Sequence, residues 1–469
     1  MKRTLILGLF SVLVILRAPG QSLFESSQLE ASKSSGEEFL TVGGFIRSAL
    51  YLGKTPLYED PYLQSAYGQV GLLVKAKAGN RATALADIRF RYGSEWQQNI
   101  SEIELREAYV DLQTGPAGFK FGKLISPWGK GSVFNPTNKL TPMDPTARSP
   151  EIDDMNLGIW ALQGRVALGS LLNLTATWNP LYRPGKLLID PIPLHGYVSF
   201  LEPDYPGVEL KDGSYGIQLD LHAPLMDAAL YWFDGYHSWP GLAFDSFLLD
   251  SLSMEPVSLD IREKAYGIRM AGVDFSIPAG SWILRAEGAW LQVNNDHRQV
   301  EYLPFPELSY TAEIERSGSW WTAIAGYYGK YILDFSPALA EPALAADPEQ
   351  YLPLMQGEMA IGPEELFALV REQIAAFNRL YNYQLEEFYH SVFLVLKADF
   401  FQNKLEIHAP LIYNISTEEW TAQASLSWLP ADGLRVKAGF NGFWGGRNSL
   451  YDMLGPVLNA GFISMTLTF

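Results

Sequence analysis

The stretch Gly461-Phe-Ile-Ser-Met-Thr-Leu-Thr-Phe469 decides the fold. Its apolar residues, at 463, 465, 467 and 469, alternate with hydroxyl residues at 464, 466 and 468. Because successive side chains of a strand point to opposite faces, one face is apolar and the other is small and polar. This pattern predicts a membrane-spanning strand of an outer-membrane β-barrel, with lipid on one side and a wet lumen on the other. We expect the β-barrel assembly machinery to recognise the chain through Phe469.

The same alternation recurs along the chain and predicts an all-β, transmembrane antiparallel β-barrel. A soluble sandwich is the alternative, but it would not need so many strands with Trp and Tyr at their ends. We expect about 18 strands, an even number that returns both termini to the periplasm, and 16 if weak segments fail. The candidate strands are 39–53, 65–78, 82–92, 103–112, 118–125, 157–168, 171–179, 214–223, 227–236, 264–277, 281–293, 316–328, 330–336, 386–400, 404–416, 420–429, 434–446 and 459–469.

Short turns alternate with long connections, as expected for the periplasmic and outer ends of a barrel. Tight turns are predicted at positions such as 78–81 and 329–330, and long outer loops at 54–64, 93–102, 126–156, 180–213, 237–263, 294–315 and 337–385. One helix is predicted inside the last loop, from Pro363 to about Leu380, because its apolar residues recur at helical spacing. It could cover apolar loop surface at the barrel mouth, fold into the lumen as a gate, or bind a partner.

The N-terminal segment predicts that the protein is exported. Residues 1–20 resemble a secretory signal peptide, with Lys2 and Arg3 before an apolar run and small residues before Gln21. Residues 21–38 are expected to form a flexible periplasmic lead-in, and 39–469 the barrel. The absence of cysteine excludes disulfides and thiolate metal sites. A net charge of −17 argues against nucleic-acid binding.

The predicted lumen face and the whole chain differ in the sign of their net charge. On the predicted lumen face, basic residues outnumber acidic ones, whereas the loops 237–263 and 337–385 are acidic. A positive wall would favour anions in a narrow aqueous pore. The alternative is that the charges only pair with one another across strands. The residues expected to supply the field are Lys75, Lys77, Arg89, Arg91, Arg165, Arg285, Arg435 and Lys437.

No catalytic motif is present. The sequence lacks a Gly-x-Ser-x-Gly elbow, a His-Glu-x-x-His pair and a phosphate-binding Gly-rich loop, so we predict no enzyme, no cofactor and no metal site. The acidic outer loops are expected to be solvated, or to share divalent cations with lipopolysaccharide. Outer-membrane lipid and lipopolysaccharide are therefore the expected neighbours.

A family resemblance lies in residues 104–145. Leu105-Arg-Glu-Ala-Tyr-Val-Asp-Leu112 is followed by Phe119-Lys-Phe-Gly-Lys123, by Trp128-Gly129 and by Asn138-Lys-Leu-Thr-Pro-Met-Asp144. This series resembles the alginate-export-type and porin-like outer-membrane barrels, with Lys123 where those proteins have arginine. The resemblance implies passage of a solute or polymer across the outer membrane.

The loop after this motif is a candidate constriction. Trp128 and Gly129 mark the point where the chain is expected to turn inward, and Pro142 and Asp144 lie in the ordered stretch that follows. The sequence leaves open whether the loop 126–156 or the loop 337–385 narrows the pore.

We therefore expect a porin-like channel in the outer membrane of a Gram-negative envelope, passing small or polymeric anionic solutes. The alternative is a surface-structural or adhesion barrel, plugged by its own loops, whose outer loops bind polysaccharide or another ligand.

Overall fold

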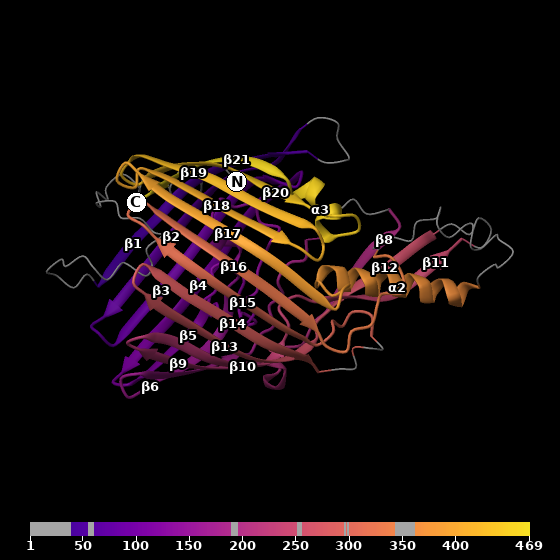
Figure 1. The fold of residues 1–469 in the computed structure, drawn as a ribbon, viewed down its shortest axis with the longest axis horizontal. Coiled ribbons are helices and arrows are strands. Elements are labelled where there is room, and N and C mark those ends of the chain that lie inside the picture. The colour runs from indigo at the N-terminus through magenta and orange to yellow at the C-terminus, as the bar shows by residue number, and fades with distance from the viewer. Residues whose placement is uncertain are drawn as a thin grey trace, which may run out of the picture.

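The computed structural model describes residues 39–54, 61–188, 196–250, 256–294, 297, 300–342 and 362–469. Eighteen of its strands form one closed sheet (Figure 1). They are β1 (Leu40–Gly53), β2 (Tyr62–Ala78), β3 (Ala82–Glu95), β4 (Gln98–Thr114), β5 (Ala117–Leu124), β6 (Ile159–Leu168), β7 (Leu172–Asn179), β9 (Ser214–Ala223), β10 (Met226–Tyr236), β13 (Gly267–Ala279), β14 (Trp282–Val293), β15 (Glu307–Ser317), β16 (Trp321–Ile332), β17 (Phe388–Phe400), β18 (Leu405–Asn414), β19 (Glu419–Ala431), β20 (Leu434–Trp444) and β21 (Ala460–Thr468). The expected signal peptide (1–20) and lead-in (21–38) lie outside the described residues.

The last strand closes the barrel. β21 pairs antiparallel with β20 on one side and with β1 on the other. Phe469 continues this seam, since its N–H donates to the Gly44 carbonyl (2.9 Å) and its carbonyl accepts from the Gly44 N–H (2.9 Å). A closed sheet leaves no edge strand, which is the condition for spanning hydrocarbon with strands.

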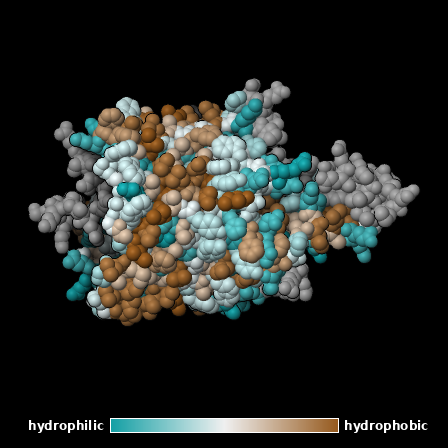
Figure 2. Space-filling view, in the orientation of Figure 1, coloured by the Kyte–Doolittle hydropathy of each residue, from teal (hydrophilic) through white to brown (hydrophobic). Residues whose placement is uncertain are grey.

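Side-chain burial follows the predicted period of two. On β1, Arg47 is 1% exposed and points into the barrel, whereas Ile46 and Leu50 are 45% and 47% exposed on its outside. The apolar residues of β21 lie outside and its hydroxyl residues inside, as predicted. Brown, apolar side chains cover much of the barrel wall in Figure 2. This outer surface is the lipid-facing belt of a transmembrane barrel.

The strand count of eighteen is confirmed, but one pair of strands was misplaced. The predicted strands 316–328 and 330–336 are wrong: the structure has β15 and β16 with a turn at 318–320. Gly329, interpreted as a turn residue, lies inside β16 opposite Tyr310, whose ring covers the place where a Cβ would stand. The glycine therefore makes room for an aromatic neighbour rather than for a turn.

Several predicted outer loops contain structure. The loop expected at 93–102 is a tight hairpin in which only Trp96 and Gln97 separate β3 from β4, both with positive φ (50° and 64°). The loops 180–213 and 237–263 contribute strands to a second, three-stranded sheet made of β8 (Val198–Asp204), β11 (Gly241–Leu249) and β12 (Pro256–Lys264).

The predicted helix is confirmed as α2 (Pro363–Tyr381). Its buried residues, among them Leu366, Ile374 and Phe377, share a hydrophobic core with Leu242 and Phe247 of β11. Figure 1 shows α2, β8, β11 and β12 projecting beyond one end of the barrel. We call these four elements the outer subdomain. The helix therefore covers loop strands outside the barrel and does not enter the lumen.

A second helix, α3 (Leu450–Leu458), was not predicted. It lies in the connection between β20 and β21, and the Ser449 side chain accepts a hydrogen bond from the Asp452 N–H at its start. Its nine residues carry Gly455 and Pro456, which weakened the helical pattern in the sequence. Within the described residues, no helix is long and apolar enough to cross a membrane.

Candidate functional site

The connection between β5 and β6, residues 125–158, folds back into the barrel, and we call it the inward loop. Its first arm runs from residue 125 to 143 and its second arm from 144 to 158. An antiparallel bridge between Met143 and Asn156 joins the two arms. The first arm contacts strands β10 and β13 to β17, and the second arm contacts strands β1, β3, β4 and β20. In the closed ring of strands, β1 and β13 stand halfway round from each other. The inward loop therefore crosses the lumen from wall to wall.

The first arm is attached to carboxylates of the wall. Glu287 on β14 accepts hydrogen bonds from the backbone N–H groups of Lys130 (3.1 Å) and Thr137 (2.8 Å). Glu313 on β15 accepts from the N–H of Ser132 (3.0 Å) and from its hydroxyl (2.7 Å). Because the acceptors are charged, these hydrogen bonds are stronger than those between neutral amide groups. The arm is therefore held by its backbone on an acidic patch.

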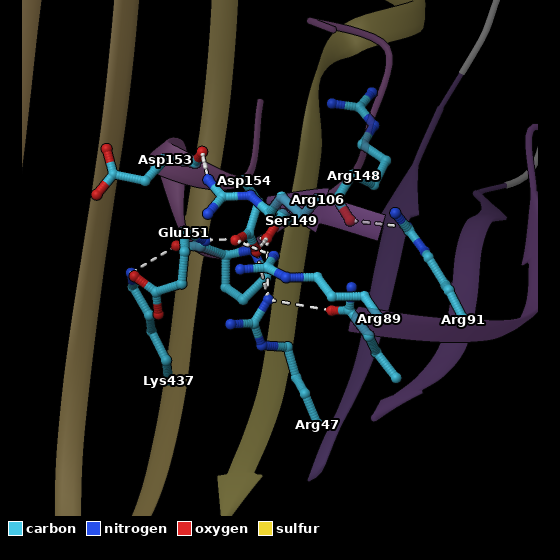
Figure 3. Close-up of polar contacts among 12 residues, drawn as sticks. Arg47, Arg89, Arg91, Arg106, Arg148, Ser149, Glu151, Asp153, Asp154 and Lys437 are labelled. Carbon is cyan, nitrogen blue, oxygen red and sulfur yellow. Dashed lines mark hydrogen bonds and ion pairs between the residues drawn. The ribbon is translucent and has the colours of Figure 1, made fainter. Parts of the chain in front are cut away.

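The second arm is attached to basic residues on the far side (Figure 3). The Asp154 carboxylate lies 2.6 Å from Arg47 on β1 and 2.6 Å from Arg89 on β3, one oxygen to each guanidinium. Glu151 lies 3.3 Å from Lys437 on β20. The short helical turn η1 (Ile152–Met155) carries Asp154 and brings its carboxylate between the two arginines. We call residues 151–155 the acidic tip of the loop. Strands β1, β3 and β20 thus bind it together.

Asp154 stays ionised in this position. The Ser149 hydroxyl donates a hydrogen bond to it (2.5 Å). Burial raises the pKa of Asp154, but the guanidiniums of Arg47 and Arg89 outweigh this effect and hold the pKa well below its usual range. Removing one partner of such a buried pair leaves an uncompensated charge.

Further arginines surround the tip. Arg91 on β3 lies 2.8 Å from Glu95 and donates to the Arg148 carbonyl of the inward loop (2.9 Å). Arg106 lies 3.7 Å from Asp87. Arg106 was not predicted as a lumen residue, because a bulge between β3 and β4 shifts the alternation there.

The net-positive lumen stays a prediction, and the corrected strand assignment adds acidic residues to the lumen that the prediction did not include. Strand β15, taken from the sequence as an outer loop, places Glu307, Glu313 and Glu315 inside the barrel. Arg285, a predicted field residue, lies 2.9 Å from Glu313 and 2.7 Å from Glu315. The wall is therefore zoned, with arginines and Lys437 on β1, β3 and β20, and glutamates on β14 and β15.

The predicted basic residues do not form one cluster. Arg89, Arg91 and Lys437 contact the second arm of the inward loop, whereas Arg285, on the opposite wall, donates to Ser132 of the first arm (3.4 Å). The others stand apart: Arg165 lies 2.5 Å from Asp111, Arg435 lies 3.8 Å from Glu406, and Lys75 and Lys77 are inward residues near the periplasmic end of β2.

The predicted constriction residues all lie in the inward loop. Trp128 is buried with its ring centroid 5.2 Å from that of Tyr231. Gly129 has φ of +93°, and a Cβ there would meet the Glu287 carboxylate at 2.5 Å, so this position requires glycine. The two remaining residues serve the turn back: the Pro142 carbonyl accepts from the Leu157 N–H (2.9 Å), and Asp144 lies 2.9 Å from Lys186.

Sequence reasoning missed Asp154, the residue on which the second attachment depends. It lies in the predicted constriction loop, but beyond the residues singled out there, of which the last is Asp144. The adjacent Asp153 and Asp154, between strands that point arginines inward, are the signal that could have indicated it. In the part of the chain that the structure describes, no group of three or more His, Asp or Glu residues could hold a metal ion.

Comparison with known proteins shows a likeness of fold. No protein-family model and no curated protein sequence matches the chain. Among solved structures, a BenF-like porin from Pseudomonas fluorescens Pf-5 matches with a TM-score of 0.51 at 9% identity, over 92% of this chain and 98% of that one. Acinetobacter baumannii OccAB3 matches with a TM-score of 0.51 at 8% identity, over 92% and 99% of the two chains. The outer-membrane protein OpdK from Pseudomonas aeruginosa matches with a TM-score of 0.50 at 8% identity, over 92% and 98%.

These similarities and the apolar belt show the fold of an outer-membrane β-barrel of the porin type. The porin-like part of the family resemblance is therefore confirmed for the fold. Its alginate-export part has no support in these comparisons.

Proposed function

We propose that the protein is an outer-membrane channel, not an enzyme, through which small solutes diffuse past the inward loop. The observation that carries this proposal is the inward loop, whose hydrogen bonds, ion pairs and apolar contacts join it to opposite walls and narrow the lumen. Water-lined walls of opposite charge on either side of a constriction orient polar solutes that pass between them.

We further propose a preference for small anions. Arg47, Arg89 and Lys437 already bind carboxylates of the inward loop, so they have the geometry to bind a carboxylate in transit. A passing anion would exchange with Asp154 or Glu151. Polymeric anions fit this arrangement less well, because a polymer needs the whole cross-section that the inward loop divides.

Single-channel recording in planar lipid bilayers tests the proposal. The full-length protein should give discrete conductance steps, and a KCl gradient should give a reversal potential that favours Cl⁻. Arg89→Glu combined with Lys437→Glu should weaken or invert this preference. Arg269→Glu is the matched control, because Arg269 is an exposed residue paired with Asp234 (3.0 Å) on the outside of the wall. A cation preference in the wild-type protein would refute the anion assignment.

A second candidate function is a plugged barrel that presents its outer subdomain to a polysaccharide or another ligand. One observation favours it: the acidic tip already neutralises Arg47, Arg89 and Lys437. The same recordings separate the candidates, since a plugged barrel gives no conductance steps.

A further inference from the structure

A second polar cluster lies behind the tip of the inward loop, toward the outer end of β1, β2 and β3. Tyr51 on β1 stands opposite Ser65 on β2, and Tyr67 lies two residues further along β2. The Arg91 guanidinium lies 3.7 Å from the Tyr67 ring centroid. Arg148 of the inward loop closes the cluster. Direct contacts join Arg148 to the other groups, because the Arg91 guanidinium donates to the Arg148 carbonyl (2.9 Å) and the Arg148 guanidinium donates to the side chain of Gln64, the residue before Ser65 (2.9 Å).

The cluster contains buried donors that have no acceptor. Tyr51, Ser65 and Tyr67 are at most 5% exposed, and none of their hydroxyls has a hydrogen-bond partner among the residues that the structure describes. The Nε atoms of Arg47, Arg91 and Arg148 are buried and unpaired as well. A guanidinium N–H can only donate, so what these groups lack is a shared acceptor. Buried polar groups in folded proteins are nearly always paired, which points to a bound species here.

The charges in the cluster favour a negative species. Arg47 has Asp154 and Arg91 has Glu95. The Arg148 backbone N–H also donates to Glu95 (2.8 Å), but among the described residues its guanidinium donates only to neutral oxygens, those of the Gln64 side chain (2.9 Å) and the Leu458 carbonyl (3.0 Å). Leu458 ends α3, and a helix C-terminus offers roughly half a negative charge. A buried guanidinium therefore remains partly uncompensated.

We propose that this cluster is a binding site for one small inorganic anion of the chloride class. The anion accepts hydrogen bonds from the Tyr51 and Tyr67 hydroxyls and completes the charge balance of Arg148. It is a resident ion that fixes the second arm of the inward loop to the wall, and it is separate from any solute in transit.

Bromide is the probe, because its anomalous X-ray scattering identifies it in a crystal. Crystals of the full-length protein grown in sodium bromide should show an anomalous peak within hydrogen-bond distance of the two tyrosine hydroxyls. The double variant Tyr51→Phe with Tyr67→Phe keeps both rings and should lose the peak. Tyr92→Phe, on the outside of β3, is the control and should retain it.

A solution measurement checks the same site. Replacing gluconate by chloride at constant ionic strength should raise the unfolding temperature of the wild-type protein and of Tyr92→Phe, but not that of the double variant. Absence of the bromide peak in the wild type would show that the cluster binds water only. Persistence of the peak in the double variant would show that the two tyrosine hydroxyls do not hold the anion, and would overturn the assigned site. Neither measurement involves conductance. The anion site can therefore be refuted while the proposed channel function stands, and the channel function can be refuted while the anion site stands.

Discussion

At the scale of single residues, Asp154 decides how the inward loop is held. Its carboxylate joins two arginines from different strands, and no other residue of the tip does so within the described part of the chain. Breaking a buried ion pair from one side costs about 3–5 kcal/mol, because the remaining charges stay buried. The attachment of the tip should therefore be sensitive to this one side chain.

Asp154→Asn should release the tip from Arg47 and Arg89. We expect a higher single-channel conductance and a stronger preference for anions, since Arg47 then loses its carboxylate partner and Arg89 keeps only Asp87 (3.2 Å). Asp153→Asn is the control, because the Asp153 side chain is exposed and makes no ion pair among the described residues. Equal conductance of wild type and Asp154→Asn would contradict the assigned role.

The low pKa of Asp154 predicts how acid affects the channel. The folded pKa lies below the ordinary value of 3.8, so the ion pairs contribute fully above about pH 4 and are lost only as the pH falls further. Between pH 7.5 and 4.5 the conductance ratio of wild type to Asp154→Asn should stay constant. If the wild type approached the variant at pH 4.5, the carboxylate would have to be protonated there.

At the scale of elements, α2 depends on one amide for its place in the outer subdomain. The Asn378 side-chain nitrogen donates to the Leu242 carbonyl (2.8 Å) and the Glu301 carbonyl (3.1 Å), and its oxygen accepts from the Leu242 N–H (2.9 Å). These bonds join the helix to the end of β11 and to a neighbouring loop.

Asn378→Ala should destabilise the outer subdomain by about 1–3 kcal/mol, because buried backbone groups lose their partners. Limited proteolysis of the intact protein should then cut near α2 at lower protease concentration, while the barrel keeps its heat-modifiable migration on gels. The exposed Ala368→Gln on the same helix should behave as wild type. Unchanged cleavage of Asn378→Ala would show that apolar packing alone fixes the helix.

The sequence predicts those strands and helices whose side-chain pattern depends only on residues close together in the chain. The two-residue period located most strands, and the helical spacing located α2. The pattern is misleading at Gly329, where the glycine makes room for the Tyr310 ring, and at β15, where Glu307, Glu313 and Glu315 resemble loop residues. The inward loop could be foreseen from Trp128 and Gly129, but not its attachments, among which are bonds that join residues 57 positions apart and 287 positions apart.

At the scale of the whole molecule, the barrel depends on the separation of its two faces. Met465→Lys would place a charge on the lipid face of the closing strand, at a cost of about 2–4 kcal/mol near the middle of the bilayer. Unfolding by urea in lipid vesicles should therefore occur at lower denaturant concentration.

Gln218→Lys is the matched control, because Gln218 lies inside the barrel and donates to Asp220 (2.7 Å), where water and a carboxylate receive the new ammonium. If both variants were equally destabilised, the assignment of the two faces would be wrong.

The wall-to-wall attachment of residues 125–158 also has a mechanical consequence. A ring of strands flattens easily into an ellipse when the surrounding bilayer compresses it, because only its hydrogen-bond ladder resists the change. A tie across the diameter shortens or stretches in any such deformation, and so it braces the circular cross-section. Breaking the contacts of the inward loop with either wall should leave a barrel that stays closed but deforms more easily under lateral pressure.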